Sequence, residues 1–506
     1  MVSRSEKIII ASFGTMAALT AVHYFIYQGP GSYFDSSWIW YASLRNNLTL
    51  VIDFFILLAL FSVAVFGFWS FVGNQKFNLF IFLLLLIFSV FTKPLGSADM
   101  SFYYSQGKVA AENRNTFVVN WKKIPFGDKS IKYFDEDQKS YPYGPITLTI
   151  SHLFYDLSRG NMVVFAFLAK IFNLLGAVCC AVLVGFIRRM LGRAVVLQDE
   201  IYNYIISPFI LFEVGVNGHL DPWFVVFVLL AILAAVKNLW QYVLPLLIIG
   251  IWIKYLPIIF LPIFLFWFLN RVTKNNLPKM LWITIVGIFL ATSITFASWY
   301  PYWQGPEVFS GITKQFSIVN LSPSINTPVY ILEKLLSTGP ELIRNFGLQI
   351  LAIFRIIIFA FVVYLAFPIA KNTILKVSKR ERVEDVYFIK ALYLASLLYL
   401  YLVQKTFWPW YLILPFFIGW ILIGIEKSPW ISLVQKYFYA PLLIYYLINF
   451  ILDVLYFRYL TNYGLGYLSV FMLRESISLI YALVCIFPLY YIIRWRKNNY
   501  EYKSAP

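Results

Sequence analysis

Long apolar stretches recur along the whole chain and are separated by short polar connections. Runs such as 80–91 and 248–268 contain almost no ionisable side chain. An apolar stretch of about 20 residues is long enough to cross the hydrocarbon core of a bilayer as an α-helix. The pattern therefore predicts an all-α fold, a polytopic bundle of transmembrane helices that forms one domain over residues 1–506.

We expect about fourteen spans, with boundaries uncertain by about 2–4 residues. The first follows Arg4 and Lys7. It is too long for the apolar part of a signal peptide and lacks a small-x-small cleavage site after it, so we interpret it as a retained span with a cytoplasmic N-terminus. The expected spans cover 8–27, 50–73, 78–94, 161–187, 202–215, 222–237, 241–253, 256–269, 279–299, 347–369, 389–404, 409–425, 437–457 and 477–494.

The region 241–269 is predicted to form two short spans rather than one. Lys254 would otherwise lie near the middle of the membrane, and Pro257 offers a natural break. With this split, the basic loops and the C-terminal tail fall on one side, which the positive-inside rule assigns to the cytoplasm. These basic residues include Arg188, Arg189, Arg193, Arg271, Lys274, Lys279, Lys371, Lys376, Arg494 and Arg496.

Composition excludes several classes of protein. The chain is 60% hydrophobic and 13% charged, whereas soluble domains carry about 25% charged residues. A soluble enzyme, a nucleic-acid-binding domain and a disordered chain are therefore excluded. The net charge of +17 is accounted for by basic cytoplasmic loops, so no nucleic acid is expected as a partner. Three cysteines cannot form a disulfide framework or a tetrahedral metal site.

The same topology places two longer segments, 95–160 and 300–346, outside the cytoplasm. Neither is large enough for a separate soluble domain. The chain contains no Gly-rich nucleotide loop after a strand, so an enzyme of this kind would not use a soluble nucleotide donor.

Polar side chains at four places fall on this outer side. Asp99 follows the third span, and His219 and Asp221 lie in the hairpin Asn217-Gly-His-Leu-Asp-Pro. Asp99 and Asp221 could be ordinary helix caps, because Asp is a favoured residue there. A carboxylate and an imidazole at a membrane interface could instead orient a phosphate or a sugar hydroxyl.

Lys254 and Lys405 are the other two candidates. Lys254 could be a snorkelling interfacial lysine, and the aromatic residues after Lys405 could form an interfacial belt. Two lysines and a histidine that face one carboxylate would instead suit an anion site with an acid/base partner. His152 has no obvious carboxylate neighbour in the sequence and is given no role.

Several short motifs resemble those of the GT-C superfamily of integral-membrane glycosyltransferases. The run that opens with Asp99 and ends in Gly107-Lys-Val is similar to the first-loop motif of that superfamily, and Tyr141-Pro-Tyr-Gly-Pro145 is similar to its proline-tyrosine segment. The hairpin 217–221, Lys254-Tyr-Leu-Pro257 and Trp408-Pro-Trp-Tyr411 resemble later motifs of polyprenyl-phosphate-mannose-dependent mannosyltransferases.

The resemblance implies an enzyme that transfers a sugar from a polyprenyl- or dolichyl-phosphate donor to a glycan or glycolipid acceptor. The family that it resembles favours mannose as this sugar. The site would lie on the extracytoplasmic or lumenal face of a multi-pass membrane protein, in contact with membrane lipid. Asp99 matches the catalytic carboxylate of the family. Met100 and Ser101 follow it, so the second acidic residue of an Asp-x-Asp pair is missing. No cofactor is therefore expected, and dependence on a divalent metal stays open. Asp35 is a rival for the carboxylate, although it lacks the downstream Gly-Lys step.

The mechanism that we expect is a single inverting displacement with Asp99 as general base. Lys254 and Lys405 would hold the donor phosphate, His219 and Asp221 would orient the donor or the acceptor, and aromatic rings would stack on sugar faces. The other expected substrate-binding residues are Tyr104, Tyr143, Asn217, Tyr255, Gln404, Trp408, Trp410 and Tyr411. A transporter or lipid-linked sugar flippase and a non-catalytic assembly subunit are the alternatives.

Overall fold

The structure is a computed structural model, and its described residues are mainly helical, which confirms the all-α class. The predicted spans 50–73, 347–369, 437–457 and 477–494 lie outside the described residues, as does Asp35. The described residues are 10–19, 21, 78–92, 94, 99–112, 115–118, 143–205, 207–272, 277–309, 384–400, 409–423 and 425.

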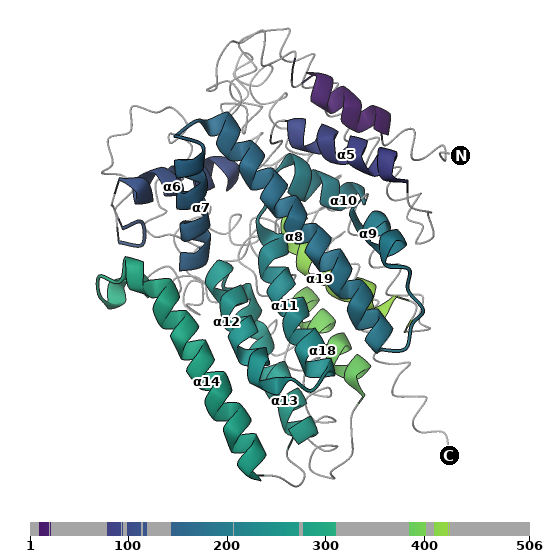
Figure 1. The fold of residues 1–506 in the computed structure, drawn as a ribbon, viewed down its shortest axis with the longest axis vertical. Helices are drawn as coiled ribbons and strands as arrows, with labels where there is room; N and C mark the ends of the chain where they lie inside the picture. The colour runs from purple at the N-terminus through teal and green to yellow at the C-terminus, as the bar shows by residue number, and fades with distance from the viewer. Residues whose placement is uncertain are drawn as a thin grey trace, which may run out of the picture.

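A long central helix, α8 (Met162–Met190), organises the bundle (Figure 1). Its N-cap Asn161 accepts hydrogen bonds from the backbone of Val163 and Val164, and Arg188 and Arg189 complement the helix dipole in its last turn. It packs against α11 (Asp221–Val236), which in turn packs against α12 (Val243–Ile253). The remaining helices of the bundle are α5 (Leu79–Phe91), α9 (Leu197–Ile205), α13 (Leu261–Val272), α14 (Leu277–Trp299), α18 (Asp385–Leu398) and α19 (Ile413–Leu422).

The described part of the predicted outer segment 95–160 contains two helices that pack against each other. They are α6 (Asp99–Ala111), which begins at the residue considered as a helix cap, and α7 (Pro145–Leu157), which was not predicted. The two helices approach closely at Gly107, where a Cβ atom would lie 2.3 Å from the backbone oxygen of Ser151. This close packing holds α6, whose first residue is Asp99, against α7.

The two predicted outer segments contact each other in the parts that the structure describes. The Asn115 amide donates to the carbonyl oxygen of Tyr302 at 2.6 Å, and the hydroxyls of Thr149 and Tyr302 are 2.9 Å apart. Tyr302 ends a short 3-10 turn, η6 (Tyr300–Tyr302), which is followed by η7 (Pro306–Phe309). Segments far apart in the sequence therefore meet at the same end of the bundle.

The predicted span 202–215 is not one regular α-helix in the structure. The chain forms α9, breaks near Ser207 and Pro208, and continues as the short α10 (Pro208–Ile210) and the π-helix η3 (Leu211–Val216). Proline has no backbone N–H to donate and cannot continue the hydrogen-bond ladder of α9. A π-helix carries one extra residue per turn, a feature often found at functional sites.

The predicted break at Lys254 is confirmed. Helix α12 ends at Ile253, and Lys254 has extended backbone angles (φ −146°, ψ 131°). The chain then forms the 3-10 helix η5 (Leu256–Phe260), with Pro257 in its first turn, before α13 begins. The span predicted over 409–425 begins as a 3-10 turn, η10 (Pro409–Leu412), and continues as α19.

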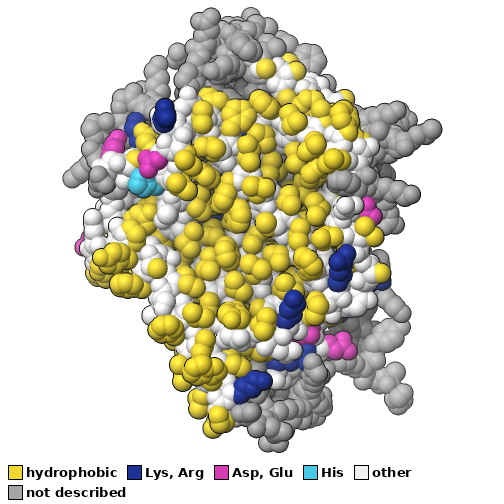
Figure 2. Space-filling model, in the orientation of Figure 1, with side chains coloured by type: hydrophobic (Ala, Val, Ile, Leu, Met, Phe, Trp, Pro, Cys, Tyr) yellow, Lys and Arg dark blue, Asp and Glu magenta, His cyan; other side chains and the backbone are white. Residues whose placement is uncertain are grey.

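The surface of the bundle is strongly apolar. Figure 2 shows a broad hydrophobic face, and exposed apolar side chains such as Phe80, Ile171, Trp282 and Phe289 come from α5, α8 and α14. Two helices of the described part, Met162–Met190 and Leu277–Tyr302, are long and apolar enough to cross a membrane, so the expected number of spans is not confirmed. A continuous exposed apolar face is typical of a membrane or protein interaction surface.

Basic residues gather where several helices end. Arg188 lies in the last turn of α8, Lys237 follows α11, and Arg271 lies in the last turn of α13. Arg188 pairs with Glu200, and Arg271 pairs with Asp385. Asp221 starts α11 and thus lies at the end of that helix opposite to Lys237.

Candidate active site

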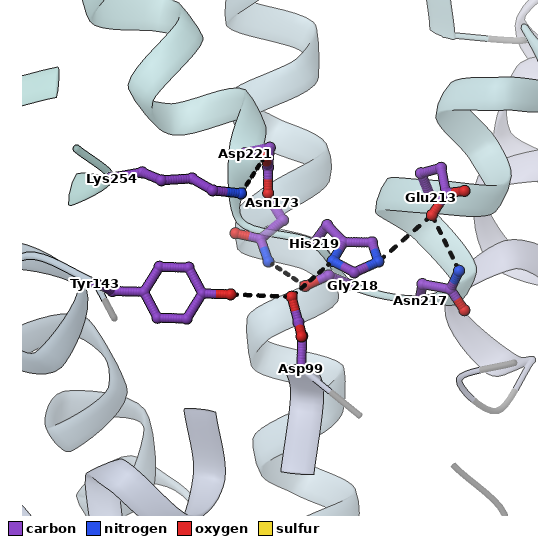
Figure 3. A network of polar contacts seen from close by, with 9 residues as sticks. All are labelled: Asp99, Tyr143, Asn173, Glu213, Asn217, Gly218, His219, Asp221 and Lys254. Atoms are coloured by element: carbon purple, nitrogen blue, oxygen red, sulfur yellow. Dashed lines mark hydrogen bonds and ion pairs between the residues drawn. The ribbon is translucent and has the colours of Figure 1, made fainter. Parts of the chain in front are cut away.

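Asp99 is the first residue of α6, and its carboxylate contacts two side chains from other elements (Figure 3). Its Oδ2 atom accepts a hydrogen bond of 3.0 Å from the Tyr143 hydroxyl and lies 3.3 Å from Nδ1 of His219. The positive end of the helix dipole favours a carboxylate in this first turn. The Asp99 side chain is 21% exposed.

His219 lies at the centre of the site and is fully buried. Its Nε2 atom is 3.4 Å from Oε2 of Glu213, and its ring stacks on Trp410 at a centroid distance of 4.1 Å. Both nitrogen contacts are ion pairs rather than well-aligned hydrogen bonds. The imidazole therefore bridges a carboxylate of α6 and a carboxylate of η3.

The turn that carries His219 has a specific backbone requirement. Gly218 adopts a left-handed φ of 72°, and a Cβ atom there would lie 2.1 Å from Cε of Met100. Asn173 on α8 donates to the Gly218 carbonyl at 2.8 Å, and Asn217 donates to Glu213 Oε2 at 3.1 Å. These contacts fix the turn against α6, α8 and η3.

Lys254 forms the second charged pair of the site. Its ammonium nitrogen donates to Oδ1 of Asp221 at 2.6 Å and lies 4.3 Å from the ring centroid of Tyr411. The Lys254 side chain is 12% exposed, whereas that of Asp221 is 1% exposed. We call the charged groups Asp99, Glu213, His219, Asp221 and Lys254, together with Tyr143, the Asp99 network.

The Tyr-Gly-Pro segment before α7 holds Tyr143 beside Lys254. The Gly144 amide donates to the carbonyl of Ile253 at 3.2 Å, and the Thr147 hydroxyl donates to the same oxygen at 2.7 Å. The Tyr255 hydroxyl donates to the Tyr143 carbonyl at 2.9 Å. The Ile253 carbonyl before Lys254 and the Tyr255 hydroxyl after it are thus hydrogen-bonded to the segment that carries Tyr143.

The charges of the network shift the ionisation of its members. Burial works against a charged imidazole, but the contacts with Asp99 and Glu213 outweigh it and raise the pKa of His219 to about 9. Burial alone would raise the pKa of the Asp99 carboxyl, whereas His219, Lys254 and Tyr143 together bring it below its ordinary value. Burial and the Asp99 charge raise the pKa of Tyr143. At neutral pH the network therefore holds an ionised Asp99 beside a protonated His219 and a neutral Tyr143.

Most of the residues singled out from the sequence meet in this site. Tyr104 lies elsewhere: its ring packs against Tyr155 and Phe165, and its hydroxyl donates to the Gly160 carbonyl. Gln404, Lys405 and Trp408 lie outside the described residues. The predicted residues that the structure brings together are Asp99, Tyr143, Asn217, His219, Asp221, Lys254, Tyr255, Trp410 and Tyr411.

Sequence reasoning missed Glu213 and Asn173. Glu213 is a lone carboxylate within the predicted span 202–215, and an ionisable residue in such a span indicates function by default. That signal could have identified it.

The expectation that His152 lacks a carboxylate neighbour is wrong, because its Nε2 is 3.3 Å from Asp156, one turn later on the exposed face of α7. Within the described part of the chain, no group of three or more His, Cys, Asp or Glu side chains could hold a metal ion.

Comparison with known families identifies the part of the chain that builds this site. Residues 38–270 match the family described as alpha-(1->6)-mannopyranosyltransferase, N-terminal domain. This match supports a mannosyltransferase activity. The predicted resemblance to GT-C mannosyltransferases and the prediction of a glycosyltransferase are thereby confirmed. The matched mannosyltransferase segment includes Asp99, Glu213 and Lys254 but ends before Trp410. No curated protein and no solved structure matches the chain.

Proposed function

We propose that this mannosyltransferase moves mannose from a polyprenyl- or dolichyl-phosphate donor to a hydroxyl of a glycan or glycolipid, with Asp99 as general base. The family description suggests an α-1,6 linkage in the product. A single displacement inverts the anomeric carbon, so an α-linked product requires a β-linked mannosyl phosphate. Chemistry of this kind needs a base for the acceptor and positive charge near the leaving phosphate.

The relative exposure of the three carboxylates carries the assignment of the base. Asp99 is 21% exposed, whereas Glu213 is fully buried and Asp221 is 1% exposed. Among these three, Asp99 is the one that an acceptor hydroxyl can reach. It is ionised at neutral pH and can therefore receive the proton as the bond between the acceptor oxygen and the anomeric carbon forms.

Lys254 is the best candidate for contact with the donor phosphate. It is more exposed than the buried His219 and already lies beside Tyr143 and Tyr411. The aromatic rings around its ammonium group could also pack against the sugar or the lipid. We place this end of the bundle on the extracytoplasmic face, because Arg188, Lys237 and Arg271 lie at other helix ends.

The flippase alternative draws support from the broken helices at η3 and Lys254, since transporters often bind substrate at such breaks. It does not require an accessible carboxylate, and the match to a mannosyltransferase domain favours sugar transfer.

The test is Asp99→Asn in the full chain, purified into lipid nanodiscs and assayed with labelled polyprenyl-phosphate mannose and a mannoside acceptor. Loss of the base should lower kcat by about 10²–10⁴-fold while donor binding is kept. Asp156→Asn, which alters an exposed carboxylate on α7, is the matched control and should keep full activity. An Asp99→Asn enzyme within about threefold of the unmodified rate would contradict the proposal.

A further inference from the structure

We propose that Glu213 is a positioning residue for Asp99: it fixes the imidazole of His219 and balances its charge, so that Asp99 can take up a proton. This inference rests on the proposed role of Asp99 as base. Glu213 is linked to Asp99 through His219, which it contacts at 3.4 Å on the ring nitrogen opposite to the one that faces Asp99.

The geometry of η3 places Glu213 where this role requires it. The Glu213 carbonyl accepts a hydrogen bond of 3.1 Å from the backbone of His219, and the Phe212 carbonyl accepts one of 2.9 Å from Asn217. The widened turn thus folds the hairpin back over the Glu213 side chain. Because the ring of His219 is fully buried and stacked on Trp410, it has little freedom to turn away from the two carboxylates.

The charge balance of the network gives Glu213 a second effect. Three carboxylates face two cations, His219 and Lys254, so the formal net charge is −1 with His219 protonated. During transfer the acceptor oxygen bonds to the anomeric carbon, its proton passes to Asp99, and the electrons of the broken C–O bond leave with the phosphate. Proton uptake by Asp99 brings the protein groups to neutrality, which a buried site favours.

Without the Glu213 charge, the same step would begin at neutrality and end with an uncompensated positive charge. Asp99 would then be a weaker base. The proton on His219 would also be held less firmly, because Asp99 would be the one carboxylate of the network left in contact with the ring. Asp99 from α6 and Glu213 from η3 contact the His219 ring. Around them lie Tyr143 before α7, Asp221 from α11, Lys254 after α12 and Tyr411 from η10, and Lys170 of α8 packs beside the turn at Gly218.

The decisive experiment is the pH dependence of mannose transfer by Glu213→Gln and Glu213→Asp in the full chain. The unmodified enzyme should lose activity as pH rises through about 9, where His219 loses its proton. In Glu213→Gln this alkaline limb should move down by at least about one pH unit, since a unit corresponds to about 1.4 kcal/mol of lost interaction with the charged ring. The kcat should fall by about 10-fold or more, with the donor KM nearly unchanged.

Glu200→Gln is the matched control. Glu200 is another ion-paired glutamate; it is partly rather than fully buried, and it pairs with Arg188 at the basic end of α8. This change should affect thermal stability without moving the alkaline limb. If Glu213→Gln does not fold, Glu213→Asp decides, because its shorter side chain withdraws the carboxylate from Nε2 and should move the limb in the same direction.

An alkaline limb that stays in place in both Glu213 variants would overturn the inference. The outcome for Asp99→Asn separates this failure from a failure of the proposed function. If Asp99→Asn is inactive but the alkaline limb is unchanged in the Glu213 variants, only the role of Glu213 is refuted. An active Asp99→Asn enzyme removes the role of Asp99 as base, and with it the basis for assigning Glu213.

Discussion

At the scale of single residues, the site consists of charges that are already paired before any substrate binds. Asp221 holds Lys254, and His219 lies between Asp99 and Glu213. Groups fixed in this way need little reorganisation when charge develops on a leaving phosphate. The pairing also keeps each buried charge from standing alone, which would cost several kcal/mol.

The Lys254–Asp221 pair offers a test that separates stability from chemistry. Lys254→Met leaves the buried carboxylate of Asp221 without its partner, so we expect a loss of about 3–5 kcal/mol in the free energy of unfolding and a strong loss of transfer. The double variant Lys254→Met with Asp221→Asn should recover most of the stability but none of the activity. Thermal unfolding in detergent and the transfer assay measure both effects. Equal stability of the single variant and the unmodified chain would show that the pair is not buried as described.

At the scale of helices, the site depends on close approaches between backbones. The start of α7 lies directly against the end of α12, and a Cβ atom on Gly144 would lie 1.9 Å from the carbonyl oxygen of Trp252. That contact determines the distance between Tyr143 on one segment and Lys254 on the other. Glycine is the residue type that permits it.

Gly144→Ala should therefore separate these two segments. We expect the free energy of unfolding to fall by about 1–3 kcal/mol. The kcat should fall more strongly, because the Tyr143 hydroxyl would lose its hydrogen bond to Asp99. Gly287→Ala on α14 is the control, since a Cβ atom there would meet only an ordinary contact of 3.5 Å with the Gln241 carbonyl. A Gly144→Ala enzyme that matches this control in kcat would contradict the role of the close approach.

The helices also show which features a sequence can predict. The break at Lys254 follows from a buried charge followed by a proline, and the structure confirms it. The π-helix does not follow from the sequence, because 202–215 is mainly apolar, with Glu213 as its one charged residue, and hydrophobicity does not report which carbonyl each N–H will meet. The meeting of Asp99, His219 and Lys254 was predicted from motifs, whereas Asn173 was missed because its role depends on the facing turn at Gly218.

At the scale of the whole molecule, the two ends of the apolar bundle carry different charged groups. The Asp99 network lies where α6 and α11 begin and α12 ends, and the basic residues lie near the ends of α8, α11 and α13. The mannosyltransferase match stops at residue 270, yet Trp410 and Tyr411 contact His219 and Lys254. Later parts of the chain therefore complete the site. The exposed apolar face seen in Figure 2 would suit the lipid-linked donor proposed above.

The most direct measurement is a structure of the full chain in a lipid nanodisc with a non-hydrolysable, carbon-linked polyprenyl-phosphate mannose. We predict a phosphate oxygen at about 2.7–3.2 Å from the Lys254 ammonium, with the anomeric carbon on the side of Asp99. A phosphate bound instead among Arg188 and Arg271, with no contact to Lys254 or Asp99, would contradict the assignment of this site.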